Sequence, residues 1–208
     1  MAERSMLRAL FFALCVAASP IAAAAGTILV YGDSLSAAYG IGQKDGWVSL
    51  LGGRLKQTNA DYSVVNASIS GETTAGGAAR IDAALGRFKP AVLVLALGGN
   101  DGLRGLPVRE MKANLDKIVR AAQARGARVL VVGMRIPPNY GGKYAQAFYD
   151  AFGEVARETK SGYMPFMLER IVDRRELFQP DQIHPTAEAQ PLLLDTVWTG
   201  LEPLLRKK

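Results

Sequence analysis

The sequence contains one cysteine and one histidine, and these two scarcities exclude several kinds of site. Cys15 has no second cysteine to pair with, so an internal disulfide and a CxxC metal or redox site are both excluded. An HExxH zinc helix and other multi-histidine metal sites are excluded as well, because His184 stands alone. If the protein uses acid–base chemistry near neutral pH, His184 is the obvious side chain available for it.

The sequence also lacks an apolar run long enough to span a membrane. A shorter apolar run near the start fits a signal peptide instead. Residues 1–25 have the pattern of a cleaved secretory signal peptide: Arg4 and Arg8 give a positive start, Leu10–Ala18 is a short apolar run, and Ala22–Ala25 offers small residues for cleavage. The run is well short of the ~20 residues that a membrane-spanning helix needs, so we expect no stable membrane insertion. The pattern predicts a periplasmic or secreted protein.

The composition of the chain fits a single compact domain over residues 26–208. The full chain has 208 residues, of which 49% are apolar and 21% charged, too apolar for a disordered protein. The formal net charge is +6, but the basic residues are dispersed and form no stripe with aromatic residues. We therefore expect no nucleic-acid partner, and we expect a monomer.

Short apolar stretches alternate with helix-like stretches after the predicted signal peptide. Strands are predicted at 27–31, 62–66, 91–97, 127–133 and 163–166, and helices at 46–57, 73–88, 107–126, 143–159 and 187–205. Strands that are apolar on both faces, separated by amphipathic helices, indicate a parallel sheet covered on both sides. We predict an α/β fold, a three-layer α/β/α sandwich with a flavodoxin-like parallel five-stranded sheet in the order 2-1-3-4-5.

Unusual residues follow three of these strands and precede the last helix. Ser34 comes directly after the first strand, Gly71 after the second and Asn100 after the third, while His184 lies in the loop before the last helix. If the strand order is 2-1-3, the first three turns are neighbours at the carboxyl edge of the sheet, where open parallel sheets bind ligands. The sequence therefore predicts a functional site at this edge.

The residue types at this edge match the needs of acyl transfer by a serine. Ser34 supplies a nucleophile, His184 a base, and Asp181 can fold back to the Nδ1–H group of the imidazole within one turn. The backbone N–H groups of Ser34 and Gly71 and the side-chain amide of Asn100 are the predicted oxyanion donors. Each residue alone has an ordinary structural explanation, such as a turn or a helix cap, but their coincidence at one edge favours catalysis.

Four blocks in order along the chain carry a family resemblance: Gly32–Ser36, Gly71, Gly99–Asp101 and Asp181–His184. They resemble the four signature blocks of the GDSL/SGNH hydrolase superfamily and, within it, the bacterial esterase, thioesterase and lysophospholipase group. The resemblance implies a Ser-His-Asp triad, an acyl-enzyme intermediate, a small-molecule acyl ester or thioester as substrate, and neither a metal nor a cofactor. The site residues that it implies are Ser34, Gly71, Asn100, Asp181 and His184.

Apolar residues in or beside the expected site loops are candidates for the lining of an acyl-chain groove. They are Leu35, Leu103, Leu106, Ile136, Pro137, Pro138 and Ile183. Ordinary packing at the edge of the sheet explains them equally well. A non-catalytic flavodoxin-like module that binds a small anion or a lipid at the same edge is the alternative to a hydrolase, and the two differ in whether Ser34 is an activated nucleophile.

Overall fold

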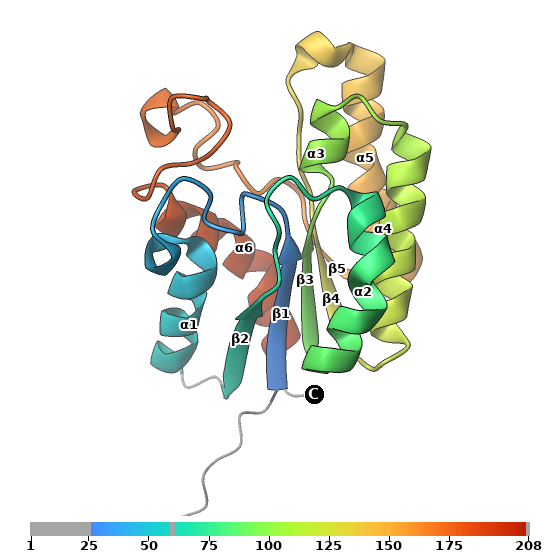
Figure 1. Cartoon of the computed structure of the whole chain (residues 1–208), viewed down its shortest axis with the longest axis vertical. Coiled ribbons are helices and arrows are strands. Elements are labelled where there is room, and N and C mark those ends of the chain that lie inside the picture. Colours follow the sequence, from blue (N-terminus) through green and yellow to red (C-terminus); the bar gives the residue numbers. More distant parts are fainter. Residues whose placement is uncertain (1–25, 59–60, 207–208) are drawn as a thin grey trace, which may run out of the picture.

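Five parallel strands form the sheet of the protein, in the order β2-β1-β3-β4-β5 (Figure 1). The computed structural model describes residues 26–58 and 61–206, apart from the side chain of Pro138, and the predicted signal peptide lies outside this part of the chain. The strands are β1 (Gly26–Gly32), β2 (Tyr62–Asn66), β3 (Val92–Ala96), β4 (Arg128–Val132) and β5 (Gly162–Met164). The predicted order 2-1-3-4-5 is confirmed.

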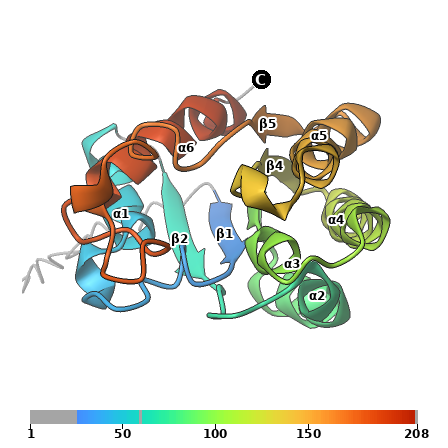
Figure 2. The same ribbon diagram turned by 90° about the horizontal axis from the view of Figure 1, so that it is seen from above.

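Helices cover both faces of this sheet, which confirms the predicted three layers (Figures 1 and 2). On one face lie α1 (Trp47–Gln57) and α6 (Gln190–Leu205). On the other lie α2 (Thr74–Phe88), α4 (Val108–Gln123) and α5 (Gly142–Thr159). No helix among the described residues is long and apolar enough to cross a membrane.

The protein has a hydrophobic core on each face of the sheet. The central strands are apolar because each contributes side chains to both of these cores. Successive side chains of a strand point to opposite faces, so Leu29 and Tyr31 of β1 pack under α2 and α4, whereas Ile28 and Val30 face α1 and α6. All five residues of β3 are buried. The edge strands β2 and β5 are only partly buried, as expected for strands paired on one side.

Helix boundaries differ from the predicted ones by a turn at several places. Pro107 is the N-cap residue of α4 rather than its first helical residue, and the helix ends at Gln123 instead of 126 because a turn leads to Gly126, whose φ is +82°. The last helix, α6, starts at Gln190 rather than 187. Strand β5 ends at Met164, one residue before Pro165, which has no N–H group for a ladder.

Four short elements were not predicted from the sequence. One is the helix α3 (Gly99–Leu103), which the glycine-rich stretch after β3 suggested as a turn. The others are the 3₁₀ turns η1 (Gln43–Asp45), η2 (Pro138–Tyr140) and η3 (Arg175–Leu177). All four lie in connections that leave the carboxyl ends of strands, so most of the irregular structure gathers at the predicted site.

Candidate active site

The connections after β1, β2 and β3 lie side by side at the carboxyl edge of the sheet, as the strand order requires (Figure 2). Ser34 sits in the turn directly after β1, Gly71 in the connection to α2, and Asn100 in the first turn of α3. A hydrogen bond ties the connection after β2 to the end of β1, because the N–H of Ile69 donates to the carbonyl of Gly32 at 3.0 Å. The predicted donors therefore come from three neighbouring strands.

The loop before α6 brings the single histidine to Ser34. His184 Nε2 lies 2.9 Å from Ser34 Oγ, although the two residues are 150 positions apart in the sequence. The other ring nitrogen, Nδ1, lies 2.7 Å from Asp181 Oδ2. A proton on Nδ1 leaves Nε2 free to accept the serine hydroxyl, which is the arrangement that a general base requires.

The Asp181 carboxylate is held in its charged form by N–H donors from its own loop. Its Oδ1 accepts the backbone N–H groups of Ile183 at 2.9 Å and His184 at 3.0 Å. The backbone N–H of His184, followed by the hydrogen bond from its ring, lowers the pKa of Asp181 to about 2. The carboxylate is therefore ionised at neutral pH and can stabilise an imidazolium as it forms.

A closed turn places Asp181 and His184 on the same side of this loop. The N–H of Gln179 donates to the carbonyl of His184 at 2.8 Å, and Gln182 takes a φ of +56° that reverses the chain. The Gln179 side chain also donates to the carbonyl of Tyr39 at 2.9 Å, which anchors the loop to the turn after β1. The Tyr39 ring lies against the imidazole, with the ring centres 4.4 Å apart.

The predicted oxyanion donors are available in this arrangement. Asn100 Nδ2 donates one N–H to the carbonyl of Glu72 at 3.0 Å, which fixes the amide beside Gly71 and leaves its second N–H uncommitted to that bond. Gly71 takes a φ of +80°, a conformation that favours glycine, and its carbonyl accepts from Arg104 Nη2 at 3.0 Å. Within the described part of the chain, the N–H groups of Ser34 and Gly71 donate no hydrogen bond.

Comparison with known proteins agrees with this geometry. The model of the GDSL-like lipase/acylhydrolase family matches residues 30–191. The chain belongs to this family. It is therefore an esterase of the serine hydrolase type, and membership decides against the non-catalytic binding module.

Similar proteins align with this GDSL-family esterase over most of their own length. Esterase TesA of Pseudomonas aeruginosa is 48% identical over 201 residues, which cover 96% of this chain and all of the relative. Thioesterase 1/protease 1/lysophospholipase L1 of Escherichia coli K12 is 39% identical over 184 residues, covering 88% of this chain and 87% of the relative. The crystal structure of the psychrotrophic esterase EstA from Pseudoalteromonas sp., inhibited by monoethylphosphonate, superposes with a TM-score of 0.83 at 40% identity, covering 87% and 99% of the two chains.

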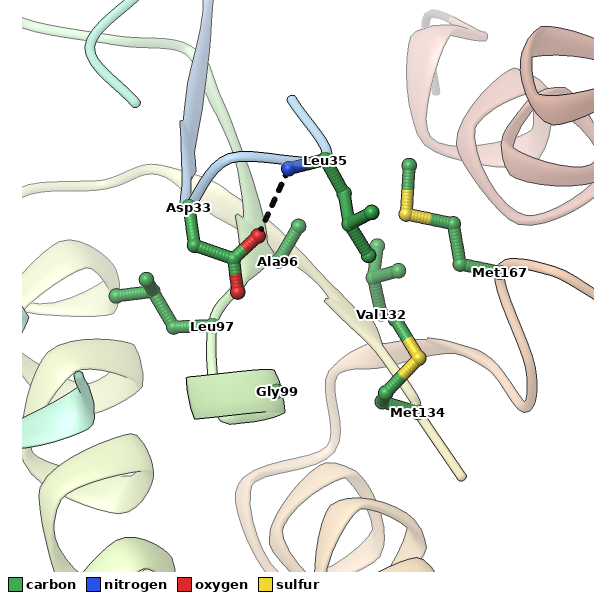
Figure 3. A pocket seen from close by; sticks show the side chains of 8 residues that line it. All are labelled: Asp33, Leu35, Ala96, Leu97, Gly99, Val132, Met134 and Met167. Carbon is green, nitrogen blue, oxygen red and sulfur yellow. Dashed lines mark hydrogen bonds between the residues drawn. The ribbon is translucent and has the colours of Figure 1, made fainter. Parts of the chain in front are cut away.

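Asp33 is a buried acid that lies next to Ser34, the predicted nucleophile of this GDSL-family esterase. Its burial was not predicted from the sequence. Its side chain points into the protein, and Oδ1 accepts the N–H of Leu35 at 3.1 Å (Figure 3). Burial raises the pKa of Asp33 to about 6. Beside it lies a cavity of about 10 Å³, the size that holds one water, lined by Leu35, Met134 and Met167 among others (Figure 3).

A second buried acid, Asp101, ties α2 to α3 and was also missed. Its two carboxylate oxygens accept the backbone N–H of Thr74 at 2.9 Å and the Thr74 hydroxyl at 2.6 Å. Asn114 of α4 donates to the same hydroxyl at 3.2 Å. The position of an acid directly after Asn100 was the one signal in the sequence, but it did not indicate burial. This network fixes the helix that carries Asn100.

The structure distributes the predicted acyl-lining residues rather than gathering them into one groove. Leu35 packs against the core under α1 and α6, and Ile136 is buried in the opposite core. Leu103, Leu106 and Ile183 are exposed by 36%, 37% and 44%. Pro137 is exposed as well, and the Pro138 side chain lies outside the described part of the chain. The acyl-binding role of these residues stays a prediction.

Metal-binding side chains do not cluster in this part of the protein. Across residues 26–58 and 61–206, no three histidine, cysteine, aspartate or glutamate side chains gather in a way that could hold an ion. Asp181 is the acid that meets the histidine ring, and Asp33 and Asp101 are buried apart from it with partners of their own.

Proposed function

We propose that Ser34, His184 and Asp181 hydrolyse carboxylic esters and thioesters through an acyl-enzyme intermediate. The observation that carries this proposal is the 2.9 Å contact between Ser34 Oγ and His184 Nε2, supported on the far side of the ring by Asp181. A serine hydroxyl is a weak nucleophile until a base takes its proton, and an oriented imidazole is such a base. The depressed pKa of Asp181 keeps its charge in place throughout.

The reaction proceeds in two matched halves. Ser34 Oγ bonds to the carbonyl carbon while its proton passes to His184 Nε2, and the carbonyl electron pair moves onto the oxygen. The N–H groups of Ser34 and Gly71 and the amide of Asn100 donate to this oxyanion. When it collapses, the bond to the leaving oxygen or sulfur breaks and His184 returns the proton to that atom. Water then repeats these steps on the acyl-serine and releases the carboxylic acid.

We further propose that the acyl part of the substrate is apolar. Leu103, Leu106 and Ile183 lie in the loops that carry Asn100 and His184, where an apolar chain attached to the reacting carbonyl would cover them. The names of the two curated relatives, an esterase and a thioesterase/lysophospholipase, support the same substrate class.

Export of the protein to the periplasm or beyond is part of the proposal, on the strength of the leader pattern in residues 1–25. Acyl-coenzyme A is a cytosolic metabolite, so an exported enzyme meets lysophospholipids, fatty-acid esters or aryl esters instead. The intact mass of protein recovered from the periplasm or medium tests this: cleavage after Ala24 or Ala25 gives a chain that begins at Ala25 or Gly26. A full-length chain in the cytosol contradicts it.

Labelling with a fluorescent organophosphonate tests the assigned nucleophile. We expect stoichiometric labelling of the protein, loss of labelling and of p-nitrophenyl ester hydrolysis in Ser34→Ala, and retention of both in Ser36→Ala. Ser36 is the matched control because its hydroxyl lies in the same turn, is buried and has no hydrogen-bond partner in the described structure. Labelling that persists in Ser34→Ala contradicts the assignment.

A further inference from the structure

Large apolar side chains stand exposed at one edge of the molecule. Among the described residues, seven are exposed by 36–51%: Tyr39, Ile69, Leu103, Leu106, Tyr140, Val172 and Ile183. All seven lie in connections that leave the carboxyl ends of the strands. Exposed apolar side chains that gather in this way mark an interaction site, whereas scattered ones need no explanation.

Six of the seven lie in a connection that carries a predicted site residue or that contacts such a connection, and we call these six the apolar rim: Tyr39, Ile69, Leu103, Leu106, Tyr140 and Ile183. Each of the five strands contributes at least one of them through the connection that follows it. Contacts join the connections around the site: Tyr39 lies against the His184 ring, and the Tyr140 hydroxyl donates to the carbonyl of Leu103 at 3.1 Å. The rim is therefore one surface built from five loops.

Val172 is the exception. Val172 lies two residues after Arg170, whose guanidinium reaches Asp195 on α6 at 3.6 Å. The turn that carries Val172 therefore lies over the layer of α1 and α6. Its exposure of 49% equals that of Ile69. Val172 thus provides an apolar side chain of matched exposure outside the rim.

The loops that carry the rim present positive charge. Lys44, Arg104, Arg135 and Lys143 are exposed in or next to the connections after β1, β3 and β4, and among the described residues none of the four pairs with a carboxylate. A surface with apolar residues at its centre and exposed cations beside them is complementary to an anionic phospholipid surface.

The acids in the connections after β1, β2 and β3 do little to offset that charge. Asp33 and Asp101 are buried, Asp45 is half-buried, and Glu72 is paired with Arg80. In the connection after β5, Asp181 is paired with His184, and four further acids are exposed: Glu169, Asp173, Glu176 and Glu188. The exposed charge beside the rim is therefore mainly positive in the connections after β1, β3 and β4, whereas the connection after β5 carries exposed charges of both signs.

We propose that the apolar rim docks the protein on the surface of an anionic phospholipid bilayer, with Ser34 facing the lipid. The rim side chains enter the boundary between headgroups and acyl chains, while the four cations meet lipid phosphates. Binding is peripheral and needs no spanning helix. The proposal goes beyond ester hydrolysis and does not depend on it, because docking requires the rim and not the Ser34 hydroxyl.

Co-sedimentation with vesicles tests docking separately from catalysis. Mature protein carrying Ser34→Ala, which cannot consume the lipid, is mixed with phosphatidylcholine vesicles that contain or lack phosphatidylglycerol. We expect binding to the phosphatidylglycerol vesicles that weakens as salt is added. Absence of binding, or equal binding to both kinds of vesicle, overturns the proposal whatever happens in the labelling experiment above.

Two sets of variants in the same background assign the binding to the rim. Ile69→Ser should weaken vesicle binding roughly fivefold, whereas Val172→Ser should leave it unchanged. Lys44→Gln combined with Lys143→Gln should weaken it roughly 10- to 30-fold. Equal effects of Ile69→Ser and Val172→Ser overturn the proposal.

Activity assays then separate lipid docking from the binding of a single acyl chain. They use protein that keeps Ser34 and carries only the rim substitution. Ile69→Ser should keep the kcat/KM for soluble p-nitrophenyl acetate, which also shows that the variant folds. It should lose activity on esters presented in anionic vesicles by the same factor as it loses binding. A raised KM for soluble long-chain esters with unchanged vesicle binding overturns docking and assigns the rim to the substrate alone.

Discussion

The ring of Tyr39 lies 4.4 Å from the imidazole of His184, tilted by 39° to it. Tyr39 is half exposed and comes from the turn that carries Ser34, whereas His184 comes from the loop before α6. An aromatic ring attracts a positive charge that forms close to it. In the proposed reaction, the Tyr39 ring would therefore stabilise the imidazolium of the intermediate state.

Removing the Tyr39 ring should slow the reaction modestly. A contact between a cation and an aromatic ring at an exposed site is worth about 0.5–1 kcal/mol, so Tyr39→Ala should lower kcat/KM roughly 2- to 5-fold. Tyr39→Phe keeps the ring and should retain nearly all activity. Steady-state kinetics on a soluble aryl ester measure both variants, and equal loss in the two assigns the role to the hydroxyl instead.

Loss of the Asn100 amide should act mainly on turnover. The side chain is fixed by its hydrogen bond to the carbonyl of Glu72, and its second N–H is assigned to the oxyanion. Asn100→Ala should lower kcat by about 10²–10³-fold with little change in KM, because the oxyanion exists only in the transition state and intermediates. Gln123→Ala, which removes an amide at the far end of α4 where it donates to the carbonyl of Thr159, is the control and should keep kcat. A rise in KM alone contradicts the assigned role.

The strand order and the meeting of the site loops could be predicted from the sequence because they follow from burial patterns. A strand that is apolar on both faces, such as Val92–Ala96, belongs to the middle of a covered parallel sheet. The carboxyl ends of such strands share one edge, so Ser34, Gly71 and Asn100 were expected to be neighbours. His184 could be assigned because the chain has no other histidine.

Tertiary contacts decide the features that the sequence did not predict. The stretch after β3 is rich in glycine and suggests a turn, yet it forms α3 because Asp101 binds Thr74 across 27 residues of sequence. Burial of Asp33 depends on the walls of its cavity, which come from β3, β4 and the loops after β4 and β5. The Tyr39 contact with His184 likewise joins distant segments, and local patterns carry no signal for it.

The Thr74 hydroxyl should matter for stability because it satisfies a buried acid. Thr74→Val keeps the shape of the side chain but removes the donor to Asp101 Oδ1 and the acceptor for Asn114. Leaving a buried polar atom without its partner costs about 1–3 kcal/mol, and we expect the free energy of unfolding to fall by this amount. Urea denaturation measures it. Thr58→Val, at the exposed end of α1, is the control and should change stability far less. Equal losses in the two variants would show that the network around Asp101 contributes nothing of its own.

Asp33 should make the protein less stable as the pH rises through the acid range. Its folded-state pKa is about 6, first of all because burial removes the hydration of the carboxylate. In the unfolded chain an aspartate titrates near ~3.9. Between about pH 4 and pH 6 the folded protein therefore binds more protons than the unfolded chain, so the free energy of unfolding attributable to this group falls as the pH rises. The fall is complete above pH ~6 and amounts to about 2–3 kcal/mol.

Asp33→Asn isolates this effect because the amide does not titrate and its Oδ1 can still accept the N–H of Leu35. Urea denaturation gives the free energy of unfolding of both proteins at about pH 4 and about pH 8. Subtracting the value of the original protein from that of the variant at each pH removes the contribution of all other groups. The variant should gain about 2–3 kcal/mol relative to the original protein between the two pH values. Parallel pH dependences would place the ionisation of Asp33 in its ordinary range.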